Sequence, residues 1–282
     1  MKKIMIFLMA MVLMQTGCVL RSVPENQTGA SADGSLITTN AAGKKVMRVR
    51  VLSYNIHHGQ GMDGRVVYQR FVDQILRYQP HLVAMQEVDD ATRRSKGVKQ
   101  IKVLGELTGM SWFFGRAMRF SGGGYGQGTL SRLKVMGSKN VALTGARGTE
   151  RRGIFGVEVD SARRFTFFNV HLSHESEKSR VLQVKQINEM VGGKNDLMLM
   201  VGDFNSESDG RAYDLLIQEW EDMMLKGGAV GSTYPSDKPN VRIDYIFARP
   251  YGKWRVIEAK VLDDGMASDH RGIFAVLECD VP

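Results

Sequence analysis

Residues 196–203 read Asp196-Leu197-Met198-Leu199-Met200-Val201-Gly202-Asp203, and Phe204-Asn205 follow directly. The segment is apolar almost throughout and does not alternate with polar residues, which is typical of a strand buried on both faces. A second strand-like segment, residues 164–171, precedes it, and residues 178–191 between them have the apolar spacing of a helix. The order strand, helix, strand indicates two neighbouring strands joined by a helical crossover, which is the repeating unit of an α/β fold.

The same layout occurs earlier in the chain. Residues 48–55 and 81–87 are strand-like, and the second of these segments is almost continuously apolar. Between them, residues 66–79 have helical apolar spacing, which Pro80 ends. We therefore predict an α/β domain with two similar halves.

Four polar residues close the predicted strands, and their spacing is equal in the two halves. Asn55 and Glu87 are 32 residues apart, as are His171 and Asp203. The strand ends along one sheet edge are where α/β folds bind their ligands. Our hypothesis is that the two halves pair their sheets and bring these four side chains together.

A glycine-rich run, Gly122-Gly123-Gly124-Tyr125-Gly126-Gln127-Gly128, lies between the two halves. It does not match GxxxxGK[ST], so it is not a phosphate-binding loop of the Walker type. We predict a loop or bulge beside the site, which leads into a strand near residues 129–132.

The 282-residue chain is 43% hydrophobic and 24% charged, which allows a sizeable core and excludes a fibrous or mostly disordered protein. Its formal charge is +8, of which two charges, Lys2 and Lys3, lie in the N-terminal segment. A basic surface favours anionic partners such as phosphates, nucleic acid or acidic lipid headgroups, and solubility alone is the alternative explanation. The two cysteines, Cys18 and Cys279, form neither a disulfide framework nor a CxxC zinc pattern.

The N-terminal residues have the pattern of a secretory signal. Two lysines precede an apolar stretch, residues 4–14, that is shorter than the roughly 20 residues of a membrane-spanning helix. Gln15-Thr16-Gly17-Cys18 follows, and small residues before a cysteine resemble a bacterial lipoprotein cleavage site, although a Gln stands where a Leu is usual. We predict a signal peptide over residues 1–17 and lipidation of Cys18, with plain secretion or a membrane-retained signal as the alternatives.

Residues 18–47 are mostly small and polar and have no apolar period, which predicts a tether. The tether would hold a folded domain, residues 48–282, away from the membrane. We expect a monomeric, exported and membrane-anchored lipoprotein, in the periplasm or on the cell surface.

Six short segments carry polar residues that strand packing does not explain. In chain order they are Tyr54-Asn55-Ile56-His57-His58-Gly59, Gln86-Glu87-Val88, Asn169-Val170-His171-Leu172, Gly202-Asp203-Phe204-Asn205, Arg242-Ile243-Asp244-Tyr245-Ile246-Phe247 and Ala267-Ser268-Asp269-His270. Together and in this order they resemble the motifs of the endonuclease/exonuclease/phosphatase superfamily, over roughly residues 48–278. The resemblance implies a four-layer α/β sandwich, in which two mixed sheets lie face to face with helices outside.

The resemblance also implies a metal site. Glu87 is similar to the main metal carboxylate of the family, Asn55 to a residue close to the ion, and Asp269 to a second carboxylate near it. Oxygen ligands without a cysteine cluster suit Mg²⁺ or Mn²⁺ rather than zinc. We expect one of these two ions as the cofactor.

Five further residues resemble the catalytic groups of the family. Asp203 resembles the group that orients or deprotonates the attacking water, and Asn205 resembles its partner in holding the water and the phosphate. His171 and His270 resemble the donors to the non-bridging phosphate oxygens, and Asp244 resembles the carboxylate that orients His270. The chemistry requires such a set, because a phosphate ester is anionic and repels hydroxide.

Three residues are candidates for contact with the substrate, each with an alternative. His57 occupies a position that is acidic in some relatives, so it either alters the metal shell or contacts the substrate. Tyr125, in the glycine-rich run, is a candidate for contact with a phosphate. Arg180 either braces the site or lies on a solvated helix face.

The predicted function is a metal-dependent phosphoric ester hydrolase, either a phosphodiesterase or a phosphatase, that uses in-line attack by an activated water. Two alternatives stay open: an exported non-catalytic binding module on the same fold, and a nuclease of extracellular nucleic acid. The expected partners are an anionic phosphate ester, with nucleic acid among the candidates, and a membrane reached through the lipid anchor.

Overall fold

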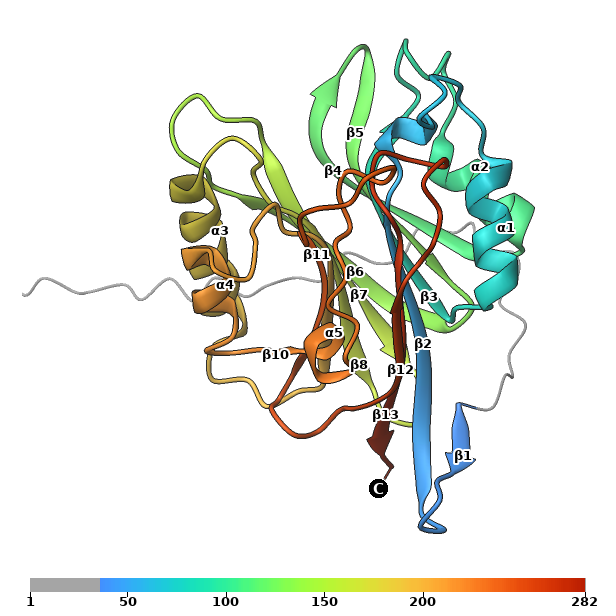
Figure 1. The fold of residues 1–282 in the computed structure, drawn as a ribbon, viewed down its shortest axis with the longest axis vertical. Coiled ribbons are helices and arrows are strands. Elements are labelled where there is room, and N and C mark those ends of the chain that lie inside the picture. Colours follow the sequence, from blue (N-terminus) through green and yellow to red (C-terminus); the bar gives the residue numbers. More distant parts are fainter. Residues whose placement is uncertain (1–35, 282) are drawn as a thin grey trace, which may run out of the picture.

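The computed structural model describes residues 36–281 and contains two β-sheets that lie face to face (Figure 1). The first sheet has seven strands, in the order β12 (Arg255–Val261), β13 (Ile273–Asp280), β2 (Lys45–Asn55), β3 (Leu82–Asp90), β5 (Gly123–Ser131) and β4 (Ser111–Phe120), with β1 (Ile37–Thr39) paired to β2. The second has six, in the order β10 (Glu221–Asp222), β11 (Asp244–Arg249), β9 (Met198–Asp203), β8 (Phe165–His171), β7 (Arg152–Asp160) and β6 (Lys134–Leu143). Both sheets are mixed, because β2 is parallel to β3 and β8 to β9, while the other pairs are antiparallel.

Apolar side chains from both sheets form the core between them. Val49 and Val51 of β2 meet Phe167 of β8 and Leu199 and Val201 of β9 in this layer, and all five are buried. They occupy alternate positions along their strands, so the residues between them point to the outer face of each sheet.

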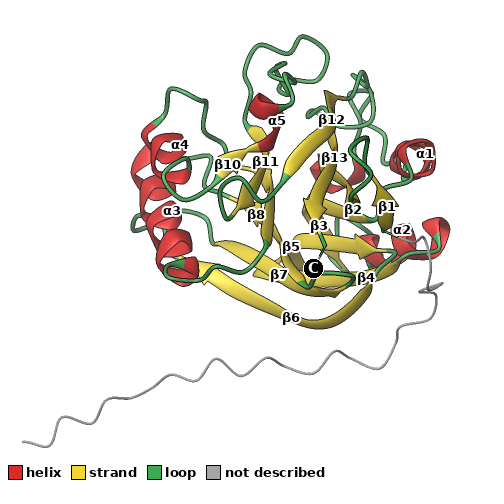
Figure 2. Ribbon diagram, turned by 90° about the horizontal axis from the view of Figure 1, so that it is seen from below, coloured by secondary structure: helices red, strands yellow, loops and turns green. Residues whose placement is uncertain are grey.

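Helices cover both outer faces, which gives the molecule four layers (Figure 2). One side carries α1 (Gln69–Tyr78) and α2 (Gln100–Thr108), and the other carries α3 (Glu177–Val191) and α4 (Arg211–Leu216). The short α5 (Met223–Lys226) and the 3-10 turn η1 (His57–Gly59) lie in connections. Because strands covered on both faces bury both sets of side chains, they read as continuous apolar runs. The predicted four-layer α/β sandwich is confirmed.

The two predicted strand–helix–strand units are also confirmed. β2, α1 and β3 form the first unit, and β8, α3 and β9 form the second. Asn55 is opposite Gln86 in the first parallel ladder, and His171 is opposite Asp203 in the second. The polar residues at the strand ends therefore reach one edge of each sheet.

The loop predicted for the glycine-rich run is wrong, because the run is part of a strand. The predicted bulge is present in the partner strands, where the register to β5 shifts between Met85 and Val88 of β3 and between Arg116 and Met118 of β4. β5 starts at Gly123, and only Ser121 and Gly122 form the turn from β4. The glycines allow close approach of neighbouring backbone, since a Cβ at Gly126 would lie 2.1 Å from the carbonyl oxygen of Gly115. The strand predicted over residues 129–132 is the second half of β5 and the residue after it.

The folded region begins earlier than the predicted boundary at residue 48. Residues 37–39, within the predicted tether, pair in antiparallel register with residues 45–47, and Val46 and Met47 are buried. The predicted signal peptide, the lipidation site Cys18 and the tether up to residue 35 lie outside the described residues. Within residues 36–281, no helix is long and apolar enough to cross a membrane.

Candidate active site

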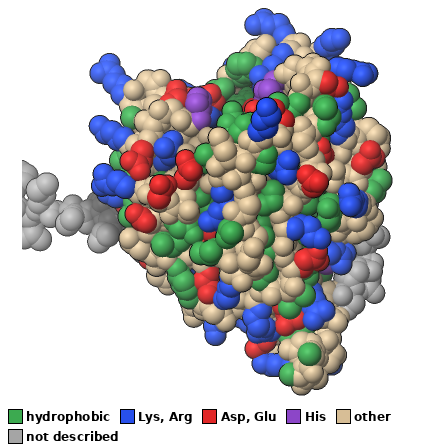
Figure 3. Space-filling view, viewed as in Figure 1, with side chains coloured by type: hydrophobic (Ala, Val, Ile, Leu, Met, Phe, Trp, Pro, Cys, Tyr) green, Lys and Arg blue, Asp and Glu red, His purple; other side chains and the backbone are tan. Residues whose placement is uncertain are grey.

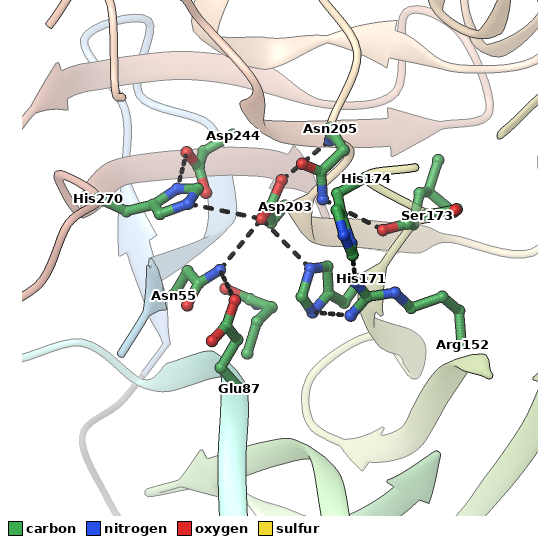
Figure 4. A network of polar contacts seen from close by, with 12 residues as sticks. Asn55, Glu87, Arg152, His171, Ser173, His174, Asp203, Asn205, Asp244 and His270 are labelled. Carbon is green, nitrogen blue, oxygen red and sulfur yellow. Dashed lines mark hydrogen bonds and ion pairs between the residues drawn. The ribbon is translucent and has the colours of Figure 1, made fainter. Parts of the chain in front are cut away.

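Four strand ends meet where the two sheets approach each other (Figure 4). The side-chain amide of Asn55, at the end of β2, donates to Glu87 Oε1 at 3.2 Å and to Asp203 Oδ2 at 3.0 Å. His171, at the end of β8, places its Nε2 3.4 Å from the same Asp203 oxygen. The four polar ends therefore converge as predicted, and the contact between Asn55 and Asp203 joins the two sheets.

Asp203 is the centre of the network, and only 1% of its surface is exposed. Its Oδ1 accepts a hydrogen bond from the backbone N–H of Asn205 at 2.9 Å, while Oδ2 faces Asn55 and two imidazoles. Burial raises the pKa of Asp203 to about 7, against the lowering effect of the His270 cation and with a further rise from Asp244. A carboxylate with this pKa can accept a proton near neutral pH.

His270 lies beside Asp203 and is held by a second carboxylate. Its Nδ1–H donates to Asp244 Oδ2 at 2.9 Å, and its Nε2 lies 3.7 Å from Asp203 Oδ2. Burial alone would lower the pKa of His270, but Asp244 and Asp203 outweigh it and raise the pKa to about 10. His270 is therefore an imidazolium at neutral pH, with its orientation fixed by Asp244.

His171, unlike His270, is uncharged, because its neighbour is an arginine. Arg152 Nη1 lies 3.0 Å from His171 Nδ1, and Arg152 Nη2 lies 2.8 Å from His174 Nδ1. A guanidinium only donates, so both Nδ1 atoms accept, and the His171 ring carries its proton on Nε2. Burial and the Arg152 charge lower the pKa of His171 well below its usual value. His171 is thus a neutral imidazole whose Nε2–H points toward Asp203.

Sequence reasoning did not place Arg152 beside the two histidines. Its side chain is buried, with 4% exposed, and it forms an ion pair with Glu150 at 3.2 Å. The observation that could have identified Arg152 is the pairing of strands: Arg152 is the first residue of β7, which pairs with β8, and the next residue, Gly153, is opposite His171. That pairing is invisible until the order of the strands in the sheet is known.

Glu87 lies in a bulge of β3, where the register to β5 shifts between Met85 and Val88. Its backbone has φ 59°, in the left-handed region, which is a strained conformation for a residue with a side chain. The ligand atoms of Glu87, His57 and His58 lie within 4.8 Å of one another, so these three residues could hold a metal ion.

The other two predicted metal residues border this group. His57 Nδ1 lies 3.8 Å from Asp269 Oδ1, and the His57 backbone N–H donates to Asn55 Oδ1 at 3.1 Å. Ser268 Oγ donates to the Asn55 carbonyl at 2.7 Å, which fixes the loop that carries Asp269 to the end of β2. His58 is an addition to the predicted set: its Nδ1 is buried without a hydrogen-bond partner. Burial, with help from the charge of Arg94, lowers the pKa of His58 to about 4, so its ring is neutral.

Three remaining predicted residues surround this centre. The side-chain amide of Asn205 donates to the Leu172 carbonyl at 3.1 Å, which ties the loop after β9 to the end of β8. Tyr125 is buried in β5, and burial, together with the charge of Glu87, raises the pKa of its hydroxyl. Arg180 Nη1 donates to the Ser173 carbonyl at 3.1 Å, so it braces the chain after β8.

Buried hydrogen bonds between Gln86 and Asn169 form a polar bridge between the two sheets next to the site. Gln86 of β3 donates from Nε2 to Asn169 Oδ1 of β8 at 2.8 Å. Asn169 in turn donates from Nδ2 to the carbonyls of Met85 at 3.0 Å and Gly128 at 2.8 Å. Because buried polar groups require such partners, the bridge fixes the two sheets relative to each other beneath Glu87 and His171.

Comparisons with known proteins agree with this geometry. The sequence matches the Endonuclease/Exonuclease/phosphatase family over residues 52–270, and no curated protein matches it. The structure of an endonuclease/exonuclease/phosphatase from Beutenbergia cavernae is 23% identical with a TM-score of 0.71, and the match covers 83% of this chain and 72% of that one. A mannosyl-6-phosphatase of Bacteroides thetaiotaomicron is 22% identical with a TM-score of 0.67, covering 81% of this chain and 99% of that one. TDP2 of D. rerio, complexed with single strand DNA product, is 18% identical with a TM-score of 0.64, covering 82% and 98%.

At these identities the solved structures establish the fold. The family match extends over most of the chain and includes all six polar segments, from Asn55 to His270. The chain therefore belongs to the endonuclease/exonuclease/phosphatase family.

Proposed function

We propose that the protein is a metal-dependent hydrolase of phosphate esters that uses in-line attack by a water molecule. The observation that carries this proposal is the surroundings of Asp203, a buried carboxylate with a pKa of about 7. One oxygen of this carboxylate faces both a cationic and a neutral imidazole, from His270 and His171. Such a set can take a proton from water and donate to an anionic phosphate at the same place.

The reaction follows from these positions. Asp203 takes the proton of the attacking water while the new bond from the water oxygen to phosphorus forms. The Nε2–H groups of His171 and His270 donate to the non-bridging phosphate oxygens, where negative charge grows. The bond from phosphorus to the leaving oxygen breaks on the opposite side, and its electron pair stays with that oxygen.

The residues beside Asn55 fit a divalent cation, which would offset the charge of the phosphate and of the leaving oxygen. The donor set consists of carboxylates, from Glu87 and Asp269, and imidazoles, from His57 and His58. The unpartnered buried Nδ1 of His58 fits a ligand position. Oxygen donors suit both Mg²⁺ and Mn²⁺. Of these two ions, Mn²⁺ binds imidazole more strongly, so we expect Mn²⁺ to be the better activator.

The relatives indicate a range of substrates rather than one. One solved neighbour is a mannosyl-6-phosphatase, and another was complexed with single strand DNA product. Phosphorylated sugars and extracellular nucleic acid are therefore both candidates, so the nuclease alternative remains. The alternative of a non-catalytic binding module is disfavoured, because the whole polar network is present and assembled.

A direct test compares hydrolysis of bis(p-nitrophenyl) phosphate and p-nitrophenyl phosphate with Mg²⁺, Mn²⁺ or EDTA. We expect turnover with either ion, faster with Mn²⁺, and none with EDTA. The ratio of the two rates would distinguish a diesterase from a monoesterase. Turnover that persists in EDTA would contradict a metal-dependent mechanism, and no turnover of either ester would favour the binding module.

We also propose that the protein is exported and anchored to a membrane through a lipid on Cys18. The support is the residue pattern of the first 18 positions alone. Expression of the full chain with Cys18→Ser should move the protein from the membrane fraction to the soluble fraction. Equal membrane association of both chains would contradict lipidation.

A further inference from the structure

The glycine-rich run has no part in the mechanism above, yet it forms one side of a concave surface. A pocket of about 530 Å³ is lined by residues 90–91, Lys99, Arg116 and residues 119–124. These residues come from the end of β3, the loop that follows it, the adjoining ends of β4 and β5, and the turn between β4 and β5. We call this surface the hairpin pocket.

The hairpin pocket carries excess positive charge. Four cationic side chains in it or beside it have no carboxylate partner among residues 36–281: Arg93, Lys99, Arg116 and Arg119. The neighbouring Arg94 is different, because Asp89 accepts from it at 2.7 and 2.9 Å. Asp90 is the one carboxylate that lines the pocket. Unpaired cations on a concave surface favour an anionic ligand.

The glycines make room for these cations. A Cβ at Gly124 would lie 3.1 Å from Arg116 Cδ, so the stem of the Arg116 side chain packs directly on the Gly124 backbone. A Cβ at Gly123 would lie 2.3 Å from the Asp90 carbonyl oxygen, which excludes any side chain there. On the side of Gly123 and Gly124 the wall of the pocket is therefore backbone without side chains. The guanidinium groups of Arg116 and Arg119 stay exposed to a ligand there.

The hairpin pocket lies beside the candidate active site. Asp90 is three residues beyond Glu87 on β3, a separation of ~10 Å at about 3.3 Å per residue. Tyr125 lies between the two places: it is opposite Asp89 in the ladder, and the guanidinium of Arg94 lies 5.5 Å from its ring centre. Figure 3 shows Lys and Arg side chains at the upper end of the molecule, as over much of this face, and histidines are visible at the upper end.

We propose that the hairpin pocket is a second anion site, which binds another phosphate group of the same substrate. This inference rests on the proposed function and deepens it: the preferred substrate carries at least two phosphate groups, one held at Asp203 and one held by Arg116 and Arg119. A nucleic-acid strand and a small bisphosphate share this chemistry. Guanidinium groups suit the role because they bind phosphate oxygens through two parallel hydrogen bonds.

The test uses the purified protein and the double variant Arg116→Ala/Arg119→Ala, with Lys185→Ala/Lys253→Ala as the matched control. Both pairs are exposed and remove two positive charges, but the control pair lies in α3 and before β12, away from the pocket. The substrates are bis(p-nitrophenyl) phosphate, with a single phosphate, a pentathymidylate strand and a sugar bisphosphate.

In the pocket variant, KM for a substrate with two or more phosphates should rise about tenfold or more relative to KM for bis(p-nitrophenyl) phosphate. The control should show no such change. A rise in KM for pentathymidylate alone would show that the pocket binds a phosphate of a nucleic-acid strand. A rise in KM for the bisphosphate alone would show that it binds a phosphate of a small molecule. Equal relative KM values for the pocket variant and the wild type with both substrates would overturn the proposal.

A binding measurement separates this inference from the proposed function. The fluorescence anisotropy of fluorescein-labelled pentathymidylate measures its binding to the protein, and the unlabelled bisphosphate is added as a competitor. Both measurements are made in EDTA, where no hydrolysis is expected. Binding that is lost in the pocket variant but kept in the control supports the hairpin pocket even if no ester is hydrolysed. Hydrolysis without any effect of the pocket variant on KM or on anisotropy would refute the pocket and leave the proposed function intact.

Discussion

His171 and His270 approach the same oxygen of Asp203 but carry different charges. Asp244 keeps His270 protonated, while Arg152 and burial keep His171 neutral. Each imidazole nevertheless presents an N–H from Nε2, so the site has two donors and only one added positive charge. A single added cation leaves Asp203 able to accept a proton, because a second one would lower its pKa further.

Replacing Arg152 should therefore change the titration of His171. In Arg152→Met, the positive charge 3.0 Å from His171 Nδ1 is gone, so the pKa of His171 should rise, although burial still holds it below its usual value. The proton is also no longer confined to Nε2, and kcat should fall on the order of 10- to 100-fold. NMR titration of the imidazole measures the first effect, and ester hydrolysis measures the second.

Arg249→Met is a suitable control, since Arg249 is also buried but lies at the opposite end of β11 from Asp244. It should leave the titration of His171 unchanged. If Arg152→Met also left that pKa unchanged, the assignment of the His171 tautomer would be wrong.

The residues of the site could be predicted from the sequence to the extent that each ends a strand or lies in a motif. Asn55, Glu87, His171 and Asp203 are of this kind, and they meet as expected. Arg152 could not be found this way, because its role depends on pairing between β7 and β8 rather than on a motif. The involvement of His58 depends on the bulge at Glu87, which has no signature in the local sequence.

At the scale of elements, β5 shows why glycine was misread. Gly126 suggested a loop or bulge, but it is needed in a strand because the Gly115 carbonyl lies where its Cβ would be. We expect Gly126→Ala to destabilise the protein by about 1–3 kcal/mol, since backbone must shift to relieve the overlap. Urea unfolding measures this.

Gly137→Ala in β6 is the matched control. The nearest atom to a Cβ at Gly137 is Glu158 Oε2, at 3.8 Å, which is ordinary contact. Its free energy of unfolding should stay close to that of the wild type. A Gly126→Ala protein as stable as this control would mean that β4 and β5 are not packed as described.

His81, the residue directly before β3, makes the free energy of unfolding depend on pH for a reason unrelated to catalysis. His81 is 7% exposed, and its Nδ1 accepts the backbone N–H of Arg50 at 3.0 Å. Burial, with the charges of Arg50 and Arg132, lowers the pKa of His81 from 6.5 to about 4. Between these two values the unfolded chain binds more protons than the folded one, so His81 makes stability rise with pH.

As pH falls from 6.5 toward 4, the wild type should lose on the order of 3 kcal/mol through this group, and His81→Gln should not. Urea unfolding of both proteins at several pH values in this window measures the difference between them. Parallel pH dependence of the two proteins would show that His81 is not held neutral by the fold.

Element order was the best predicted level of structure. The two equal spacings of 32 residues correspond to two parallel pairs of strands, β2 with β3 and β8 with β9. One helix connects the strands of each pair. Prediction was poorer where pairing is antiparallel and connections are short. β4, β6 and β7 were not predicted as strands, because Gly, Arg and Lys interrupt their apolar pattern, for example in Lys134–Leu143.

At the scale of the whole molecule, the active site exists only where the two sheets meet. Asn55 and Glu87 come from one sheet, and His171 and Asp203 come from the other. The bridge between Gln86 and Asn169 and the contact between Asn55 and Asp203 hold these halves in register. The overall sandwich could be predicted from the family motifs, but the hairpin pocket could not, because it depends on how β3, β4 and β5 pair, and β4 was not predicted as a strand.

The central claim is that Asp203 activates the water that attacks phosphorus. The most direct test is kcat of Asp203→Asn against wild type with bis(p-nitrophenyl) phosphate and saturating Mn²⁺, with the melting temperature of both proteins as the control for folding. We expect kcat to fall by about 10²- to 10⁴-fold, because the amide keeps the shape of the side chain but cannot accept the proton. A folded Asp203→Asn protein with kcat close to that of the wild type would contradict the mechanism.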